Sequence, residues 1–110
     1  MIEKMMNKRA IVIGSGFGGI ASALRLNKLG FRVTLVERLD ALGGRARVFQ
    51  KEGYRHDAGP TVITAPFLFE ELYELYEKKL NDHLNFVPLD PWYRFYFHNG
   101  KTFDYRPSLE

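Results

Sequence analysis

Residues 10–37, AIVIGSGFGGIASALRLNKLGFRVTLVE, carry the strongest structural pattern of this chain. It holds an apolar run, a glycine-rich loop, a segment with helical spacing and a second apolar run that ends at Glu37. β-Branched runs of this kind favour buried parallel strands, and a helix usually connects such strands. We therefore expect a βαβ unit with a helix over residues 20–29, Gly30 as its C-cap, and a strand over residues 32–36 that is buried on both faces.

The loop GSGFGG, residues 14–19, has the spacing of a dinucleotide-binding turn. Gly14 permits a tight turn after the strand, Gly16 lets the backbone approach a pyrophosphate, and Gly19 lets the helix pack on the strand. The free N–H groups and the positive dipole end of the helix then face the anion. The loop predicts a pyrophosphate site without a lysine, and a glycine-rich turn that binds nothing is the alternative.

Glu37 ends the second apolar run, where a dinucleotide fold places an acid. A carboxylate there accepts hydrogen bonds from the adenosine ribose hydroxyls and repels a 2′-phosphate. The residue therefore favours FAD or NAD over NADP.

The composition limits the size and the class of the protein. One βαβ unit is half of a complete nucleotide fold, so we expect these 110 residues to be the front of a longer protein.

A net charge of +3 with both signs interspersed does not indicate nucleic acid binding. The sequence has no cysteine, and its histidines have no companions at ligand spacing, so we assign no metal site. Residues 1–9 are polar rather than typical of a signal peptide, and we expect a cytoplasmic protein.

Two further glycine-containing segments follow the βαβ unit. Gly43-Gly44-Arg45 permits close backbone approach to a ligand, although an ordinary turn is the alternative. Residues 47–50 and 54–57 predict a hairpin, joined across residues 51–53. The hairpin leads into DAGPTVIT, residues 57–64, a rigid extended segment that can lie against a flat ring.

The last part of the chain shows structural patterns. Apolar residues at steps of three and four predict an amphipathic helix over residues 66–80 that packs on a core. Residues 86–89 predict a short edge strand. Residues 92–97 and 102–105 predict a hairpin with a two-residue Asn99-Gly100 turn, in which Phe97 opposes Thr102 and both faces are aromatic.

The four motifs, at residues 14–19, 37–38, 43–46 and 57–64, resemble in order and spacing the N-terminus of bacterial-type phytoene desaturases, which are FAD-dependent carotenoid desaturases. The resemblance runs from about residue 10 to residue 105, and residues 57–64 are its most discriminating part. It implies an α/β fold that begins with the βαβ unit of a Rossmann-like FAD-binding domain, followed by a hairpin, a helix and the start of an antiparallel substrate-domain sheet.

The resemblance also implies the residues that bind FAD. Glycines and Phe17 of the loop would hold the pyrophosphate, Glu37 the ribose, Gly44 and Arg45 the phosphate side, and residues 59–62 would lie near the isoalloxazine ring. The candidate cofactor-binding residues are Gly14, Ser15, Gly16, Phe17, Gly18, Gly19, Glu37, Arg38, Gly44, Arg45, Gly59, Pro60, Thr61 and Val62. No catalytic residue is assigned.

The implied activity is the desaturation of an apolar polyene such as phytoene by the full-length protein. Residues 1–64 would form the first part of a discontinuous FAD-binding domain, and residues 65–110 the beginning of a substrate-side domain. We expect little activity and weak FAD binding from these residues alone, and peripheral contact of the whole protein with the cytoplasmic membrane face. The alternatives are a retinol saturase or carotenoid isomerase type of flavoenzyme, and a non-catalytic lipid-binding protein related to GDP-dissociation inhibitors.

Overall fold

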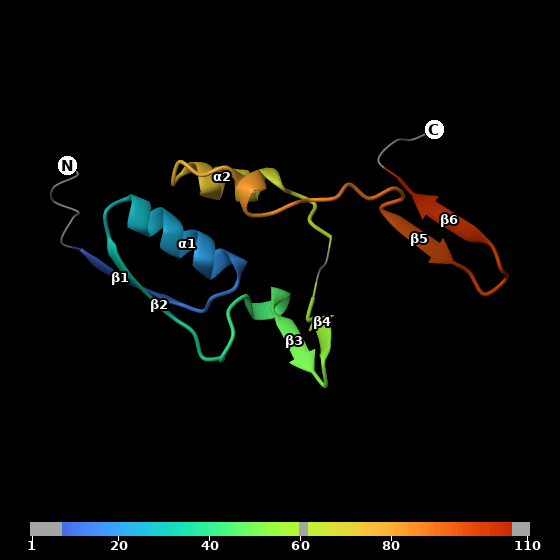
Figure 1. Cartoon of the computed structure of the whole chain (residues 1–110), viewed down its shortest axis with the longest axis horizontal. Helices are drawn as coiled ribbons and strands as arrows, with labels where there is room; N and C mark the ends of the chain where they lie inside the picture. The colour runs from blue at the N-terminus through green and yellow to red at the C-terminus, as the bar shows by residue number, and fades with distance from the viewer. Residues whose placement is uncertain (1–7, 60–61, 107–110) are drawn as a thin grey trace.

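The computed structural model describes residues 8–59 and 62–106. Its β5–β6 hairpin lies apart from the other elements (Figure 1). The elements, in chain order, are strand β1 (Arg9–Ile13), helix α1 (Phe17–Lys28), strand β2 (Arg32–Val36), the 3₁₀ helix η1 (Gly44–Ala46), strands β3 (Val48–Lys51) and β4 (Tyr54–Asp57), helix α2 (Phe67–Glu74), the 3₁₀ helix η2 (Leu80–Asp82), and strands β5 (Tyr93–Tyr96) and β6 (Thr102–Tyr105).

The first three elements form the predicted βαβ unit. β1 and β2 pair in parallel, with Ala10 opposite Val33, and α1 connects them. The helix begins three residues earlier than its apolar periodicity indicates, directly after the glycine turn. At its other end, the N–H of Gly30 donates to the carbonyl of Asn27 at 2.9 Å. Gly30 has a φ of 90°, so it closes the helix as the sequence predicts.

The sheet of β1 and β2 is covered on one face by α1. Ala10 and Val12 are partly buried, whereas Ile11 and Ile13, on the opposite face, are 70% and 86% exposed. Leu35 and Val36 of β2 are also exposed. The expectation that residues 32–36 are buried on both faces is therefore wrong for the described residues, because α1 packs on one side of this sheet only.

The β3–β4 hairpin follows the prediction closely. Lys51 pairs with Tyr54, so the loop consists of Glu52 and Gly53. Both loop residues have positive φ, 53° and 83°, as a type I′ turn requires.

Helix α2 is shorter than the predicted segment of residues 66–80. The chain turns at Glu77, whose φ is 56°, and the N–H of Lys78 donates to the carbonyl of Tyr73 at 3.1 Å. After this turn η2 brings Leu80 back, and Leu80 is 6% exposed. Leu80 fits the apolar spacing of the helix although it lies beyond the helix end, because a turn brings it to the interior.

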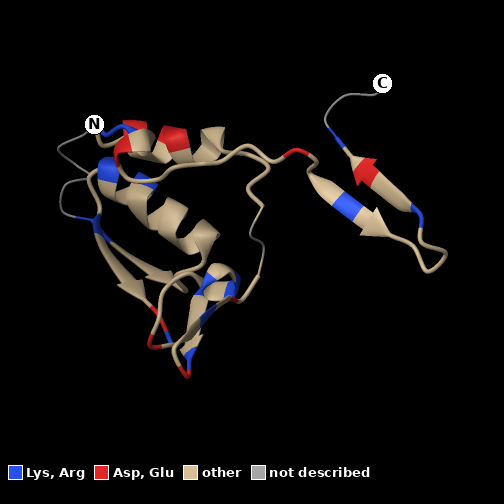
Figure 2. Ribbon diagram, turned by 45° about the vertical axis from the view of Figure 1, so that its right-hand side comes forward, with Lys and Arg blue, Asp and Glu red and all other residues tan. Residues whose placement is uncertain are grey.

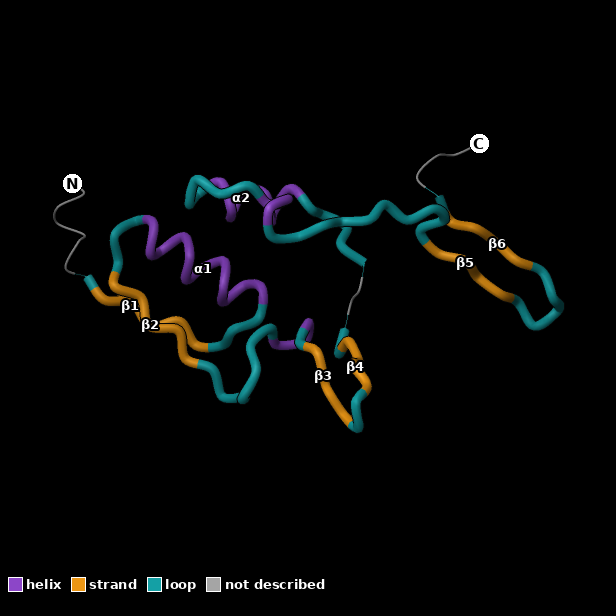
Figure 3. Tube along the Cα trace, in the orientation of Figure 1, coloured by secondary structure: helices purple, strands orange, loops and turns teal. Residues whose placement is uncertain are grey.

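The helices α1 and α2 pack against each other. Long loops connect α2 to the hairpins on either side of it in the chain (Figure 3). The Phe17 and Phe69 rings meet edge to face, with centroids 5.5 Å apart. Arg25 of α1 forms an ion pair with Glu71 of α2 at 2.6 Å, and the ribbon of Figure 2 is coloured for basic residues on α1 and for acidic residues on α2. The Tyr76 hydroxyl donates to the carbonyl of Leu24 at 2.9 Å. Neither helix of the described residues is long and apolar enough to cross a bilayer.

Residues 86–89 do not form the predicted edge strand. The Phe86 ring lies against Phe69 of α2, with centroids 5.8 Å apart. Pro88 cannot donate a backbone hydrogen bond to a neighbouring strand. The segment thus contacts α2 through the Phe86 side chain and does not join a sheet.

The β5–β6 hairpin has a different register from the predicted one. Tyr96, rather than Phe97, lies opposite Thr102. The N–H of Phe97 donates to the carbonyl of Lys101 at 2.9 Å, which leaves a three-residue loop, and Gly100 has a φ of 79°. The Asn99 side chain accepts a hydrogen bond from the N–H of Lys101 at 3.1 Å. The predicted two-residue turn is wrong because Asn99 does not adopt positive φ.

The observed register divides the hairpin into two unlike faces. One is largely aromatic, and the other carries Tyr96 beside an ion pair, so the prediction of two aromatic faces holds fully for one face only. Arg94 lies opposite Asp104 and donates to it twice, at 2.6 and 2.8 Å. These hydrogen bonds lower the pKa of Asp104. Side chains that lie directly opposite in an antiparallel pair share a face. The other face carries four aromatic rings, those of Tyr93, Phe95, Phe103 and Tyr105.

Candidate dinucleotide-binding site

The loop of residues 14–19 joins β1 to α1 and is held to the end of β2. The N–H of Gly14 donates to the carbonyl of Val36 at 2.7 Å. Helix α1 starts after Gly16 with no side-chain cap and no acidic residue in its first turn, within the described chain. A Cβ at Gly16 or at Gly18 would meet no heavy atom within 4 Å. The helix start thus offers uncapped N–H groups beside open space, as an anion requires.

Gly19 brings α1 against the loop. A Cβ at this position would overlap the carbonyl oxygen of Gly14 and would lie 3.7 Å from Cγ1 of Val12. The helix can approach the strand end only because residue 19 has no side chain.

Ser15 and Glu37 connect the loop to the second strand. Ser15 is fully buried, and its hydroxyl donates to Oε2 of Glu37 at 2.6 Å. The N–H of Ser15 donates to the same oxygen at 2.8 Å, and the N–H of Leu39 donates to Oε1 at 2.9 Å. Ser15 is one of the predicted cofactor contacts, and its hydrogen bond to Glu37 was not predicted. The carboxyl ends of two adjacent parallel strands meet at one sheet edge, and this juxtaposition was the available signal.

These hydrogen bonds change the acidity of Glu37. Donation by the Ser15 hydroxyl, followed by the N–H groups of Leu39 and Ser15, lowers its pKa from 4.5 to about 2. A carboxyl whose pKa is lower in the folded state than in the unfolded state stabilises the fold. Its full contribution is present at pH values above the unfolded-state pKa. That contribution is lost as the pH falls from 4.5 toward 2.

We expect Glu37→Gln to reduce the acid sensitivity of the protein. The measurement is the urea midpoint of the full-length protein from pH 6 to pH 3, as far as it remains soluble. The midpoint of the variant should fall less steeply below pH 4.5 than that of the wild type, from a lower value at neutral pH. Glu74→Gln, on the exposed surface of α2, is the control. Parallel pH profiles for wild type and Glu37→Gln would contradict the ionised Ser15–Glu37 link.

The Gly43–Gly44 turn packs on the loop. The N–H of Gly43 donates to the carbonyl of Ser15 at 2.9 Å. Gly44 has a φ of 57°, and a Cβ there would lie 3.0 Å from Cα of Gly16. Both the backbone conformation and the close approach require glycine at residue 44.

The third glycine-containing segment reaches the same place through its backbone. A Cβ at Gly59 would overlap the carbonyl oxygen of Arg45, and the N–H of Ala58 donates to the carbonyl of Arg47 at 2.9 Å. The structure thus brings together the residues 14–19 loop, Glu37, the Gly43–Gly44 turn and Gly59.

The remaining predicted site residues are placed by their packing or their exposure. The Phe17 ring points toward Phe69 of α2, so its side chain serves packing. Arg38 and Arg45 are exposed, and Val62 is partly buried. Pro60 and Thr61 lie outside the described residues. Contacts of all these residues with a cofactor stay a prediction.

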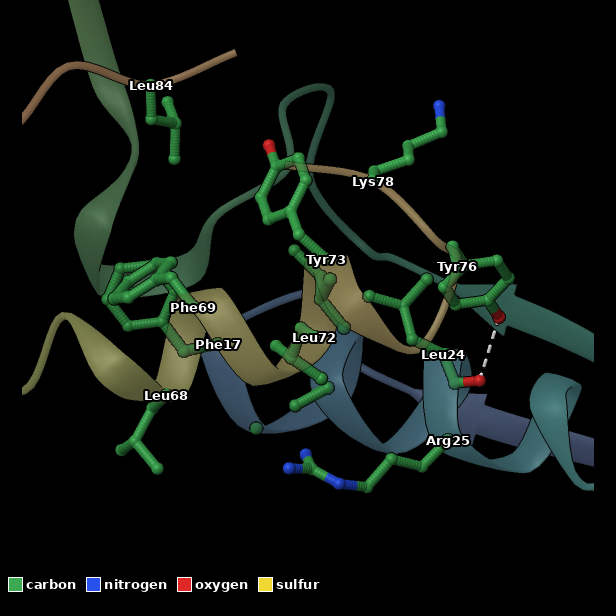
Figure 4. Close-up of a pocket in the computed structure, with 13 residues that line it drawn as sticks. Phe17, Leu24, Arg25, Leu68, Phe69, Leu72, Tyr73, Tyr76, Lys78 and Leu84 are labelled. Carbon is green, nitrogen blue, oxygen red and sulfur yellow. Dashed lines mark hydrogen bonds between the residues drawn. The ribbon is translucent and has the colours of Figure 1, made fainter. Parts of the chain in front are cut away.

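An apolar groove of about 710 Å³ lies between α1 and α2, next to the start of α1 (Figure 4). Phe17 and Phe69 lie together at one end of it, and Tyr76, hydrogen-bonded to the carbonyl of Leu24, lies at the other. Its lining includes Phe17, Leu24, Leu68, Phe69, Leu72 and Tyr73.

The chain is similar to several enzymes of carotenoid metabolism. A phytoene desaturase (lycopene-forming) of Pantoea ananas is 47% identical over 98 residues, which are 89% of this chain and 20% of the relative. A phytoene desaturase (neurosporene-forming) of Cereibacter sphaeroides is 40% identical over 93% of this chain and 20% of the relative. A 4,4'-diapolycopene oxygenase of Methylomonas sp. is 37% identical over 89% of this chain and 20% of the relative.

The chain thus spans about a fifth of the length of these relatives. The predicted similarity to bacterial phytoene desaturases is confirmed. Residues 12–78 match the family model described as NAD(P)-binding Rossmann-like domain, which confirms the predicted fold class. The chain belongs to the NAD(P)-binding Rossmann-like domain family.

Proposed function

We propose that the full-length protein binds FAD and desaturates a carotenoid precursor such as phytoene. The observation that carries this proposal is the joint geometry of the residues 14–19 loop and Glu37, in a chain 47% identical to a phytoene desaturase. Two parallel strands, an uncapped helix start and an acid at the second strand end suit the ADP half of a dinucleotide.

The residues present fit that half of FAD. The open positions of Gly16 and Gly18 leave room for a pyrophosphate beside the N–H groups of α1. Glu37, whose pKa is lowered to about 2, is negatively charged at neutral pH and can accept a hydrogen bond from a ribose hydroxyl. When bound, a flavin would accept a hydride and so supply the oxidising step.

The other predicted roles remain part of the proposal. Gly59 and Val62, with Pro60 and Thr61, would lie along the flavin ring. Residues 1–64 would belong to the cofactor domain, and residues 65–110 would begin the substrate-side domain. The aromatic face of the β5–β6 hairpin suits an apolar polyene, because apolar ligands bind among aromatic and aliphatic side chains. An unactivated C–H has no acidic proton, so positioning and exclusion of water matter more than a base.

Oxygenation of a carotenoid is the second candidate. It is supported by the 37% identity with the 4,4'-diapolycopene oxygenase of Methylomonas sp.. Desaturation removes two hydrogens from the substrate, whereas an oxygenase adds oxygen atoms to it.

Incubation of the FAD-loaded, full-length protein with phytoene in phospholipid vesicles tests both candidates. Desaturation should move the absorbance of the extracted pigment to longer wavelength and lower its mass by about two hydrogens per new double bond. A gain of ¹⁸O from labelled oxygen would instead favour oxygenation. Co-sedimentation of the protein with the vesicles tests the proposed membrane contact. Bound flavin with unchanged phytoene under aerobic conditions would count against desaturation.

A further inference from the structure

Ser15 lies where three segments of the candidate site meet. Its hydroxyl and its N–H both donate to Oε2 of Glu37, at 2.6 and 2.8 Å. Its carbonyl accepts from the N–H of Gly43 at 2.9 Å. Because the exposed fraction of Ser15 is 0%, its side chain cannot contact a ligand directly.

These bonds determine how much of Glu37 remains for a ligand. A carboxylate has about four acceptor positions. The N–H of Leu39 donates to Oε1 at 2.9 Å, so with the two bonds from Ser15 three of these positions are used by the protein. About one position is left for a hydroxyl donor, and Ser15 and Leu39 determine its direction.

We propose that Ser15 is a positioning residue for the dinucleotide: its hydroxyl orients the Glu37 carboxylate toward the ribose, and its carbonyl holds the Gly43–Gly44 turn against the loop. This inference rests on the proposed function. Without the hydroxyl, Oε2 keeps the N–H of Ser15 and Oε1 keeps the N–H of Leu39, so the carboxylate is held by two donors instead of three and its orientation is less restricted. Binding must then order the side chain again, which weakens ribose recognition. The backbone N–H groups that face the pyrophosphate are unchanged.

The test compares ADP with 2′,3′-dideoxy-ADP as competitors of FAD binding to the full-length apoprotein. Wild type should prefer ADP by roughly tenfold or more, the effect of one hydrogen bond to a charged group. Ser15→Ala should reduce this preference to about threefold or less, with a smaller change in the affinity for dideoxy-ADP. Ser22→Ala, the same substitution at an exposed position of α1, should keep the wild-type preference.

A purely structural serine would give a different result. In that case Ser15→Ala would weaken the binding of both nucleotides equally and keep the preference for ADP. This result would overturn the inference while the proposed function stands. If Ser15→Ala does not fold, as its melting temperature would reveal, Ser15→Cys retains a similar side chain with a weak donor, and the same two outcomes apply. Failure of the wild-type protein to bind ADP or FAD would overturn the proposed function as well.

Discussion

Gly16→Val should weaken dinucleotide binding by roughly ten- to a hundredfold and leave the melting temperature of the apoprotein nearly unchanged. Residue 16 has an ordinary extended conformation, with φ −69° and ψ 177°, and a Cβ there would meet no heavy atom within 4 Å. The added Cβ therefore meets no neighbour, and valine lowers the stability only through its weaker preference for the N-cap position. The valine side chain occupies the space in which we propose that the pyrophosphate approaches the start of α1.

Flavin fluorescence quenching during titration of the full-length apoprotein measures this loss. Ser22→Val adds the same side chain to an exposed position of α1 and should bind FAD as the wild type does. A folded Gly16→Val protein with wild-type affinity would contradict a pyrophosphate site at this loop.

Gly19→Ala should act on the fold itself. The added Cβ would overlap the carbonyl oxygen of Gly14, and this neighbour is backbone that cannot rotate away. Overpacking of this kind costs about 1–3 kcal/mol, so α1 must move away from the loop. We expect a lower melting temperature and, because the loop shifts, weaker cofactor binding as well.

Gly18→Ala is the matched control for this change. It adds the same methyl group one residue earlier, where no heavy atom lies within 4 Å, and alanine is the better helix former. Its melting temperature should equal or exceed that of the wild type. If Gly19→Ala melts at the temperature of Gly18→Ala, the close packing of α1 on Gly14 is not required for the fold.

The two hairpins show that local sequence signals predict one turn correctly and the other incorrectly. Glu52-Gly53 forms a two-residue turn in which both residues have positive φ, whereas the stronger signal Asn99-Gly100 forms part of a three-residue loop. The bidentate pair of Arg94 and Asp104 requires these residues to lie opposite each other. The predicted register, with Phe97 opposite Thr102, would put Arg94 opposite Tyr105, and the pair of Arg94 and Asp104 would then not form.

The end of α2 illustrates the same limit. Apolar spacing predicted a helix to residue 80, but the chain turns at Glu77 and η2 places Leu80 inside. Periodicity records which residues become buried. It does not record whether a helix or a turn brings them there.

Local patterns in the sequence were sufficient to predict the βαβ unit, the glycine-rich start of α1 and the β3–β4 pairing. These features depend on side-chain alternation, helical spacing and glycine, which act within a few residues of the chain. The folded chain was needed to find that Ser15 holds Glu37, 22 residues away, that Gly44 packs on Gly16, and that four aromatic rings of the β5–β6 hairpin share one face. Such contacts depend on where parallel strands end and how turns meet, because a polar group takes the partner that the folded chain places within hydrogen-bond distance.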